Sequence, residues 1–210
     1  MQAEVFRAWI TAAARVIAEQ RDHLTQLDAA IGDADHGINL DRGFTAVLST
    51  IESAAPATPG AVLTLTGTTL ISKVGGASGP LYGTAFRRAG KALGDAADVN
   101  MPGLAAALDA ALAGVQQLGA AREGDKTMVD ALAPATAAFS KATAEGASDT
   151  DALAALVEAA QAGAAATISM QALKGRASYL GPRSVGHEDP GAASTALILG
   201  ALRDAALAGQ

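Results

Sequence analysis

Long alanine-rich stretches, separated by short breaks that contain glycine and proline, most constrain the fold of this chain. Alanine has the highest helix propensity, whereas the β-branched and aromatic residues that favour strands are sparse. The 210 residues include four Phe, two Tyr and one Trp. We therefore expect an all-α protein. Its length suits a single domain over residues 1–210, and no long linker divides it.

The apolar spacing and the breaks predict about eight helices. The expected helices are residues 3–22, 38–52 and 62–74, one opening at Pro80, 100–121, one after Asp125 with Pro134 as a kink, 149–173 with Asp149 as its cap, and 191–207. Helices of similar length with short connections pack antiparallel to their neighbours. We therefore expect an antiparallel eight-helix barrel or bundle.

The order of these helices also predicts where a ligand site should lie. In an up-and-down arrangement every second connection reaches the same end of the molecule. Residues 28–39, 75–80, 119–127 and 174–191 follow the first, third, fifth and seventh expected helices. These four segments hold most of the polar and glycine residues of the connections. We expect them to share one end and to form the site there.

The segment IGDADHG, residues 31–37, carries an unusual concentration of acid. Asp28, Asp33 and Asp35 would repel one another unless a positive charge lay between them. Carboxylate oxygens are the ligands that Mg²⁺ and Ca²⁺ prefer. An EF-hand is excluded because Ile38 and Phe44 stand where its Gly and Glu are required. A solvated turn with Asp33 as a helix cap is the alternative to a metal site.

Two further segments contain glycine-rich turns. GGASGP, residues 75–80, precedes a helix and could bind an anion through backbone N–H groups. GAAREGDKT, residues 119–127, departs from a P-loop because Asp125 lies between Gly124 and Lys126 and no strand precedes it. Taken alone, each segment is also explained as an ordinary turn or helix cap.

The fourth segment, RASYLGPRSVGHEDPG, spans residues 176–191. It brings Arg176, Arg183, His187 and Asp189 into one irregular stretch. Arginine can donate two parallel hydrogen bonds to phosphate oxygens, so this stretch could contact a nucleotide. His187 and Asp189 are equally explained as turn residues before the last helix.

Charge and cysteine content exclude other classes of function. The formal net charge is −6, and Lys and Arg are scattered rather than clustered, which argues against a nucleic-acid partner. The chain has no Cys, which excludes disulfides and thiolate chemistry and fits a cytoplasmic protein. Charges interrupt the first 23 residues, so we expect neither a signal peptide nor a membrane span.

Taken together, the four segments resemble one family, the nucleotide-binding L subunit of bacterial dihydroxyacetone kinase. The matching pieces are LDAAIGDADHGINLDRGF, GGASGPLYGT, GDKTMVDAL and RASYLGPRSVGHEDPGAAS, which occur in the family's order between residues 27 and 194. One departure is Ala34, where the family usually has Gly. The exchange should matter only if the backbone there needs a positive φ.

The resemblance implies a ligand set. Asp28, Asp33 and Asp35 would hold two Mg²⁺ ions, which would in turn hold the diphosphate of ADP (or ATP). The divalent charge would offset both the aspartates and the phosphates. Met128 would lie near the base, and Ser78 and Arg176 would contact phosphate. The full set of implied nucleotide contacts is His36, Gly37, Ile38, Asn39, Ala77, Ser78, Gly119, Thr127, Met128, Arg176 and Asp189.

The resemblance also implies a function. Bound ADP would be phosphorylated by a phosphohistidine donor protein of the phosphotransferase system and would pass the group to dihydroxyacetone on a separate K subunit. No catalytic side chain is expected beyond the metal and nucleotide site, and a homodimer is compatible with it. The alternatives are an L subunit of an ATP-dependent kinase for dihydroxyacetone or another small ketose, a non-catalytic nucleotide-sensing adaptor, and a purely structural bundle.

Overall fold

The computed structural model describes residues 1–209, which contain nine α-helices and no strand. The helices are α1 (Ala3–Glu19), α2 (Arg21–Ile31), α3 (His36–Ala54), α4 (Pro59–Lys73), α5 (Ser78–Leu93), α6 (Met101–Gly119), α7 (Val129–Ala144), α8 (Asp149–Ala166) and α9 (Pro190–Ala208). Two 3₁₀ helices, η1 (Thr167–Ser169) and η2 (Arg176–Ser184), lie between α8 and α9. The all-α expectation is confirmed.

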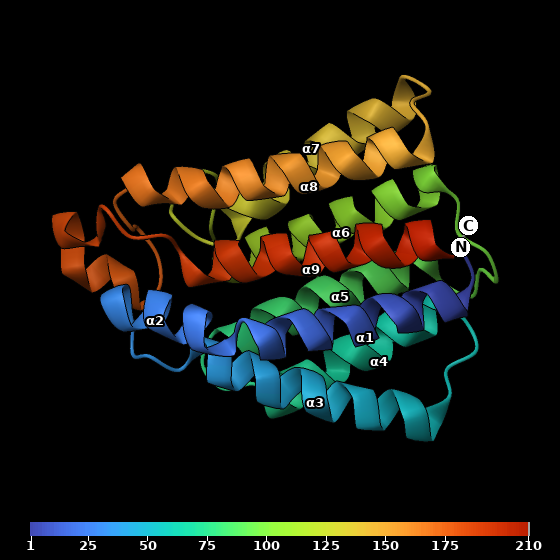
Figure 1. The fold of residues 1–210 in the computed structure, drawn as a ribbon, viewed down its shortest axis with the longest axis horizontal. Helices are drawn as coiled ribbons and strands as arrows, with labels where there is room; N and C mark the ends of the chain where they lie inside the picture. The colour runs from blue at the N-terminus through green and yellow to red at the C-terminus, as the bar shows by residue number, and fades with distance from the viewer. Residues whose placement is uncertain (210) are drawn as a thin grey trace.

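Eight of the helices pack in a closed order. Each of α3 to α8 contacts the next helix along the chain, and α1 contacts both α3 and α9. Figure 1 shows these eight helices running side by side in alternating directions. The remaining helix, α2, projects beyond the others at the end where η2 also lies, and it contacts α3, α9 and η2.

A small aromatic cluster marks the centre of the core. Trp9 of α1 lies 6.1 Å from Phe6 and 5.6 Å from Phe86 between ring centroids, and Phe44 lies 6.4 Å from Phe86. The indole nitrogen of Trp9 donates a 2.9 Å hydrogen bond to the carbonyl of Ile198 in α9. The cluster therefore connects α1, α3, α5 and α9 near the middle of the bundle, where the indole N–H finds the partner that burial requires.

Glycines let α4 and α5 approach closely. A Cβ atom on Gly67 would lie 2.4 Å from the carbonyl oxygen of Gly83, and one on Gly60 would lie 2.2 Å from that of Gly94. Both distances are shorter than any van der Waals contact. The two helices can therefore hold this spacing only with glycine at these positions.

The expected helix bounds differ from the structure in three places. The first helix breaks at Gln20, where ψ is 6°, and restarts as α2, so Asp28 lies on a helix rather than in a loop. The cap of α8 is Ser148, whose hydroxyl accepts from the N–H of Asp151 at 3.1 Å, and not Asp149. This helix ends at Ala166 instead of residue 173. Pro134 lies inside α7, as expected.

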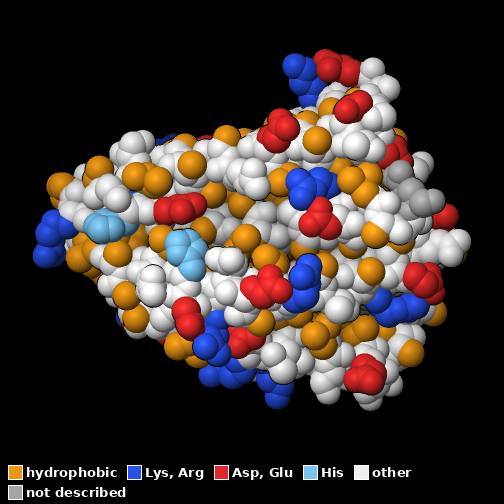
Figure 2. All heavy atoms as spheres, in the orientation of Figure 1, with side chains coloured by type: hydrophobic (Ala, Val, Ile, Leu, Met, Phe, Trp, Pro, Cys, Tyr) orange, Lys and Arg blue, Asp and Glu red, His pale blue; other side chains and the backbone are white. Residues whose placement is uncertain are grey.

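Two further expectations concern the distribution of surface charge and the presence of membrane-spanning helices. Figure 2 shows Lys and Arg interspersed with Asp and Glu over the visible face, in line with the scattered cations of the sequence. Two segments, Asp149–Ser169 and Pro190–Ala208, are long and apolar enough to cross a membrane by length and composition. This is a weak indication, because α8 and α9 pack against each other and α9 also packs against α1.

We predict opposite effects of two glycine substitutions on stability. Gly67→Ala should lower the free energy of unfolding by about 2 kcal/mol, because its methyl group would force α4 and α5 apart. Gly200→Ala in α9 has open space around the new methyl group and should raise it by about 0.5 kcal/mol through helix propensity. Urea unfolding followed by circular dichroism measures both. Equal stability of the two variants would contradict the packing described here.

Candidate functional site

A cavity of about 290 Å³ lies at the end of the bundle where α2 and η2 are found. Its volume is at the small end of the range typical of small-molecule sites. All four segments expected to share an end line it, contributing for example Asp28, Ser78, Thr127 and Arg176. The grouping that the order of the helices predicts is therefore confirmed.

Three carboxylates meet at this cavity. Asp28 lies in the last turn of α2, Asp33 and Asp35 follow in the turn before α3, and one oxygen of each lies within 4.8 Å of the others. Asp28 is buried, and its Oδ2 accepts hydrogen bonds from the backbone N–H of Asp35 at 2.8 Å and of His36 at 3.2 Å. The backbone between α2 and α3 is thereby wrapped around the Asp28 carboxylate.

Two small residues make this turn possible. A Cβ atom on Gly32 would lie 2.0 Å from Oδ1 of Asp28, so the turn requires glycine there. Ala34 has a φ of 62°, in the left-handed region that glycine adopts without strain. Because φ is positive at residue 34, alanine in place of the family's usual glycine is expected to strain the backbone there.

One positive charge already lies against the acidic cluster. Arg176, in the first turn of η2, places its Nε 2.9 Å from Oδ2 of Asp33, and both side chains remain partly exposed. The three carboxylates offer only oxygen atoms as ligands, which suits a hard divalent cation such as Mg²⁺. The residues present therefore fit the metal that the sequence predicts.

Four helices begin at the cavity. His36 opens α3, Ser78 opens α5, Val129 opens α7 and Pro190 opens α9, and all four residues line the cavity wall. The first turns of a helix leave backbone N–H groups without intrahelical partners and carry a partial positive charge. The cavity therefore combines an acidic cluster with several anion-attracting helix ends.

The segment before α7 is held by a buried aspartate. Asp130 accepts hydrogen bonds from the backbone N–H of Gly124 at 2.6 Å and of Thr127 at 2.7 Å. This fixes the turn that carries Thr127 and Met128 into the cavity. Met128 is buried and forms part of the apolar wall, together with Ile31, Leu81 and Val115.

A buried lysine joins this turn to the segment before α9. Lys126 is 1% exposed, and its ammonium group donates to the carbonyl oxygens of Thr167, at 2.7 Å, and His187. Burial lowers the pKa of Lys126, while Asp189 and Asp130 act in the opposite direction. Asp189 caps α9 by accepting from the N–H of Ala192 at 2.8 Å. Burial raises the pKa of Asp189 to about 7.

Three expected nucleotide contacts lie beside the cavity instead of lining it. Gly37 packs against α2, where a Cβ atom would lie 2.0 Å from the carbonyl oxygen of Arg21. Ile38 is 50% exposed and lines a different surface hollow with Arg21. Asn39 is buried behind the glycine turn, and its side-chain oxygen accepts from Arg42 at 2.8 Å. The first turn of α3 thus presents His36 to the cavity and turns the next three residues away.

The other expected contacts line the cavity: His36, Ala77, Ser78, Gly119, Thr127, Met128, Arg176 and Asp189. Sequence reasoning missed Lys126 and Tyr82, although both stand inside the matching segments. Charged and phenolic side chains are more often at least partly exposed. Nothing in the sequence indicates that these two are buried beside the site.

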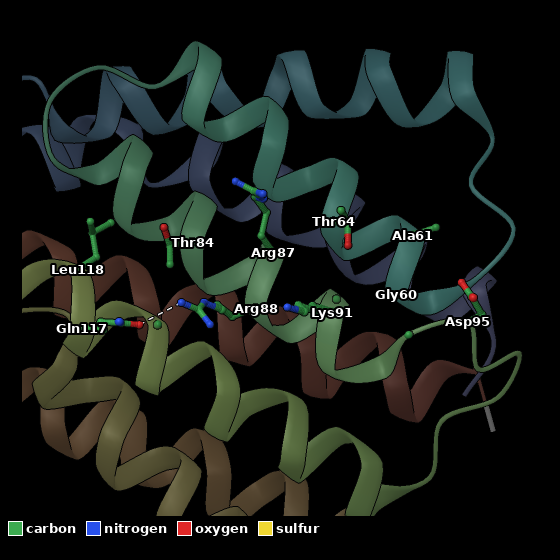
Figure 3. Close-up of a pocket in the computed structure, with 13 residues that line it drawn as sticks. Gly60, Ala61, Thr64, Thr84, Arg87, Arg88, Lys91, Asp95, Gln117 and Leu118 are labelled. Atoms are coloured by element: carbon green, nitrogen blue, oxygen red, sulfur yellow. Dashed lines mark hydrogen bonds between the residues drawn. The ribbon is translucent and has the colours of Figure 1, made fainter.

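A larger hollow lies elsewhere. It is an open groove of about 930 Å³ along α5, between α4 and α6, and its walls carry Arg87, Arg88 and Lys91. Figure 3 shows Arg88 reaching Gln117, whose side-chain oxygen accepts a hydrogen bond at 3.0 Å. These cations are exposed, and Asp95 is the acid that lines the groove with them. The smaller cavity, with its converging carboxylates and helix ends, is the better candidate for chemistry.

Relief of the strain at Ala34 is testable. Ala34→Gly should raise the free energy of unfolding by about 0.5 kcal/mol, because the left-handed backbone costs alanine more than the added chain entropy of glycine. The matched control is Ala30→Gly inside α2, which should lower it by a similar amount. Chemical denaturation of both variants checks the pair. If both substitutions destabilised the protein equally, the backbone at Ala34 would not be strained.

The raised pKa of Asp189 predicts a pH dependence. An unfolded aspartate has a pKa near 4, so between about pH 4 and pH 7 the folded chain keeps a proton that the unfolded chain has released. The free energy of unfolding should therefore fall as pH rises through this window. Asp189→Asn, which stays uncharged and can still cap α9, should reduce that fall. Urea unfolding at several pH values measures it, and parallel curves would refute the assignment.

Comparison with known proteins agrees with these observations. Residues 30–204 match the DAK2 domain family. The chain is 42% identical over 191 residues to the PEP-dependent dihydroxyacetone kinase ADP-binding subunit DhaL of Escherichia coli (strain K12), covering 91% of each chain. It is 40% identical over 194 residues to the ADP-binding subunit DhaL of PEP-dependent dihydroxyacetone kinase 1 of Listeria innocua, covering 92% of each.

A solved structure shows the same fold. The dihydroxyacetone kinase from C. freundii in complex with AMP-PNP and Mg²⁺ superposes with a TM-score of 0.72 and 30% identity, over 94% of this chain and 33% of that one. The resemblance that the four segments carry is therefore confirmed over nearly the whole chain. This chain belongs to the DAK2 domain family.

Proposed function

We propose that this chain is the ADP-binding phosphotransfer subunit of a dihydroxyacetone kinase. The observation that carries the proposal is the convergence of Asp28, Asp33 and Asp35 within 4.8 Å at a cavity where four helices begin. Relatives that the chain matches over 91% and 92% of their length are ADP-binding subunits of PEP-dependent dihydroxyacetone kinases. The supported reaction class is phosphoryl transfer.

The three aspartates would hold two Mg²⁺ ions. Their oxygen-only donor set, their proximity and the partial burial of the cluster support this assignment. Bound Mg²⁺ would supply positive charge that offsets the phosphates and the charge that develops during transfer. Asp28 would orient the metal ligands, since its Oδ2 already accepts hydrogen bonds from the backbone N–H groups of Asp35 and His36.

The remaining walls would hold the nucleotide. The start of α5 at Ser78, which has no side-chain cap, suits the negatively charged phosphates. The apolar side chains of Leu81, Val115 and Met128 suit the flat face of a base. The phosphate end would then lie near the aspartates, and the base would lie toward the start of α7.

Arg176 would add a donor at the phosphate end. It now pairs with Asp33, which places its guanidinium at the edge of the acidic cluster. A guanidinium can donate two parallel hydrogen bonds to phosphate oxygens. The start of η2, at Arg176 and Ala177, lines the cavity and would carry this contact.

The partners follow from the reaction. Dihydroxyacetone would be bound by a separate K subunit, and a phosphohistidine protein would rephosphorylate the bound ADP. The description of the relatives as ADP-binding subunits supports a division of labour between chains. We place the chain in the cytoplasm, where a cysteine-free kinase subunit of this kind would meet both partners.

Nucleotide analysis combined with thermal melting tests the proposal. Purified protein should carry ADP, and a chelator should release the ADP and lower the melting temperature in the same step. At a hundredfold excess of ligand over Kd, binding stabilises the native state by about 2.7 kcal/mol. Asp28→Asn, Asp33→Asn and Asp35→Asn should each lose the stabilisation by Mg²⁺ and ADP.

The matched control is Asp109→Asn, which changes an exposed aspartate of α6 and should keep the full response. A melt that is indifferent to Mg²⁺ and ADP in the parent protein would rule out the proposed function. Rapid exchange of the bound nucleotide with free ATP would assign the chain to the ATP-dependent alternative. Tight binding without transfer to any ketose would favour the adaptor.

A further inference from the structure

A buried hydrogen-bond network surrounds His36 at the inner wall of the cavity. We infer that Ser194 and Tyr82 are positioning residues, which fix the imidazole of His36 and, through it, the hydroxyl of Ser78 at the phosphate end of the site. The inference rests on the proposed function for the identity of the ligand. Neither Ser194 nor Tyr82 is among the nucleotide contacts that the family resemblance implies.

The network joins the starts of three helices. His36 Nε2 lies 2.9 Å from Ser194 Oγ in α9, and His36 Nδ1 lies 3.2 Å from Ser78 Oγ at the start of α5. The hydroxyl of Tyr82 lies 2.7 Å from the same Ser194 oxygen. Since Ser78 and Tyr82 are four residues apart in α5, they face the same side of that helix. The chain of contacts runs from Ser78 through His36 and Ser194 to Tyr82.

The donors and acceptors of this network assign the proton of the His36 imidazole to one of its two nitrogens. The hydroxyl of Ser194 lies 2.8 Å from the carbonyl of Pro190, which can only accept, so the Ser194 proton points there. The Ser194 oxygen then accepts from its other neighbours, including the N–H on Nε2 of His36. A neutral imidazole carries one proton. Nδ1 is therefore the acceptor and takes the hydroxyl proton of Ser78.

Burial stabilises the hydrogen bonds of this network. Ser194 is 0% exposed, Tyr82 is 3% exposed and His36 is 7% exposed, so a broken hydrogen bond would not be replaced by bulk water. Burial also raises the pKa of Tyr82 to about 12, which keeps the phenol protonated as a donor.

The consequence is a defined orientation for Ser78. Its hydroxyl proton points to Nδ1 of His36, so the backbone N–H groups at the start of α5 are left to meet an anion. Without Ser194, the imidazole loses the acceptor that sets its proton on Nε2. The ring could then rotate or exchange its proton, and the Ser78 hydroxyl would lose its fixed direction. Mg²⁺·ADP would then bind to a less ordered wall.

Nitrogen-15 NMR of the histidine side chains tests the inference directly. The chain has three histidines, His23, His36 and His187, so the signals of His36 can be assigned by substitution. The parent protein without nucleotide should show His36 with its proton on Nε2. Ser194→Ala should give a mixture of the two neutral forms, and Tyr82→Phe a smaller shift in the same direction.

Affinity for Mg²⁺·ADP, measured by calorimetry, is the second readout. Ser194→Ala should weaken binding about tenfold and Tyr82→Phe about threefold, as expected for one or part of one oriented hydrogen bond. The matched control is Thr66→Val, which removes another buried hydroxyl, bonded to Val62 in α4, away from His36. It should leave both the NMR signals of His36 and the affinity unchanged.

The outcomes separate this inference from the proposed function. An unchanged His36 spectrum in Ser194→Ala, or an affinity equal to that of the parent, would overturn the inference. A loss of affinity of the same size in Thr66→Val would show a general loss of packing and would also overturn it. If the parent binds no Mg²⁺·ADP, the proposed function fails, while the NMR experiment still decides whether Ser194 and Tyr82 set the form of His36.

Discussion

The carboxylate of Asp28 is the interaction on which the functional end of this molecule depends. It is buried in the last turn of α2 and accepts the backbone N–H groups of Asp35 and His36. The same contact brings Asp33 and Asp35 near Asp28 and sets the start of α3. One side chain therefore fixes both the acidic cluster and the helix that presents His36.

The rest of the fold delivers other helix ends to the same place. Because the eight long helices alternate in direction, α3, α5, α7 and α9 all begin at the cavity. Close approach of neighbouring helices at glycines such as Gly67 and Gly60 fixes the lateral spacing of these helix starts. Within that frame, Lys126 and Asp130 hold the turn before α7, and the hydrogen bonds of His36 connect α3 to α5 and α9.

Much of this could be predicted from residue types. The acidic cluster was predictable because three aspartates within eight residues require an explanation, and the shared end followed from the alternation of helices. The direction of side chains within a turn was not predictable. Ile38 points away from the cavity although His36, two residues earlier, faces it, because the start of α3 is set by the Asp28 contact and the packing of Gly37 on α2.

Burial of polar side chains was the other part that the sequence did not reveal. Lys126 and Tyr82 stand in segments that were singled out, but their roles depend on carbonyl and hydroxyl groups from residues far away in the chain. Gln20 illustrates the same limit for secondary structure. No glycine or proline marks the break between α1 and α2, yet that break separates the helix of the bundle from the helix that carries Asp28.

The charges of the site explain why metal and nucleotide would bind together. Asp28, Asp33 and Asp35 attract divalent cations and repel phosphates, whereas Arg176 and the helix starts attract phosphates and repel cations. Neither ligand alone satisfies both sets of groups. A nucleotide that brings its own divalent ions places negative charge beside the helix starts and positive charge beside the aspartates. It would also offer Arg176 a phosphate partner in place of Asp33, and the Asp33 carboxylate that is now paired would then be free to bind the metal.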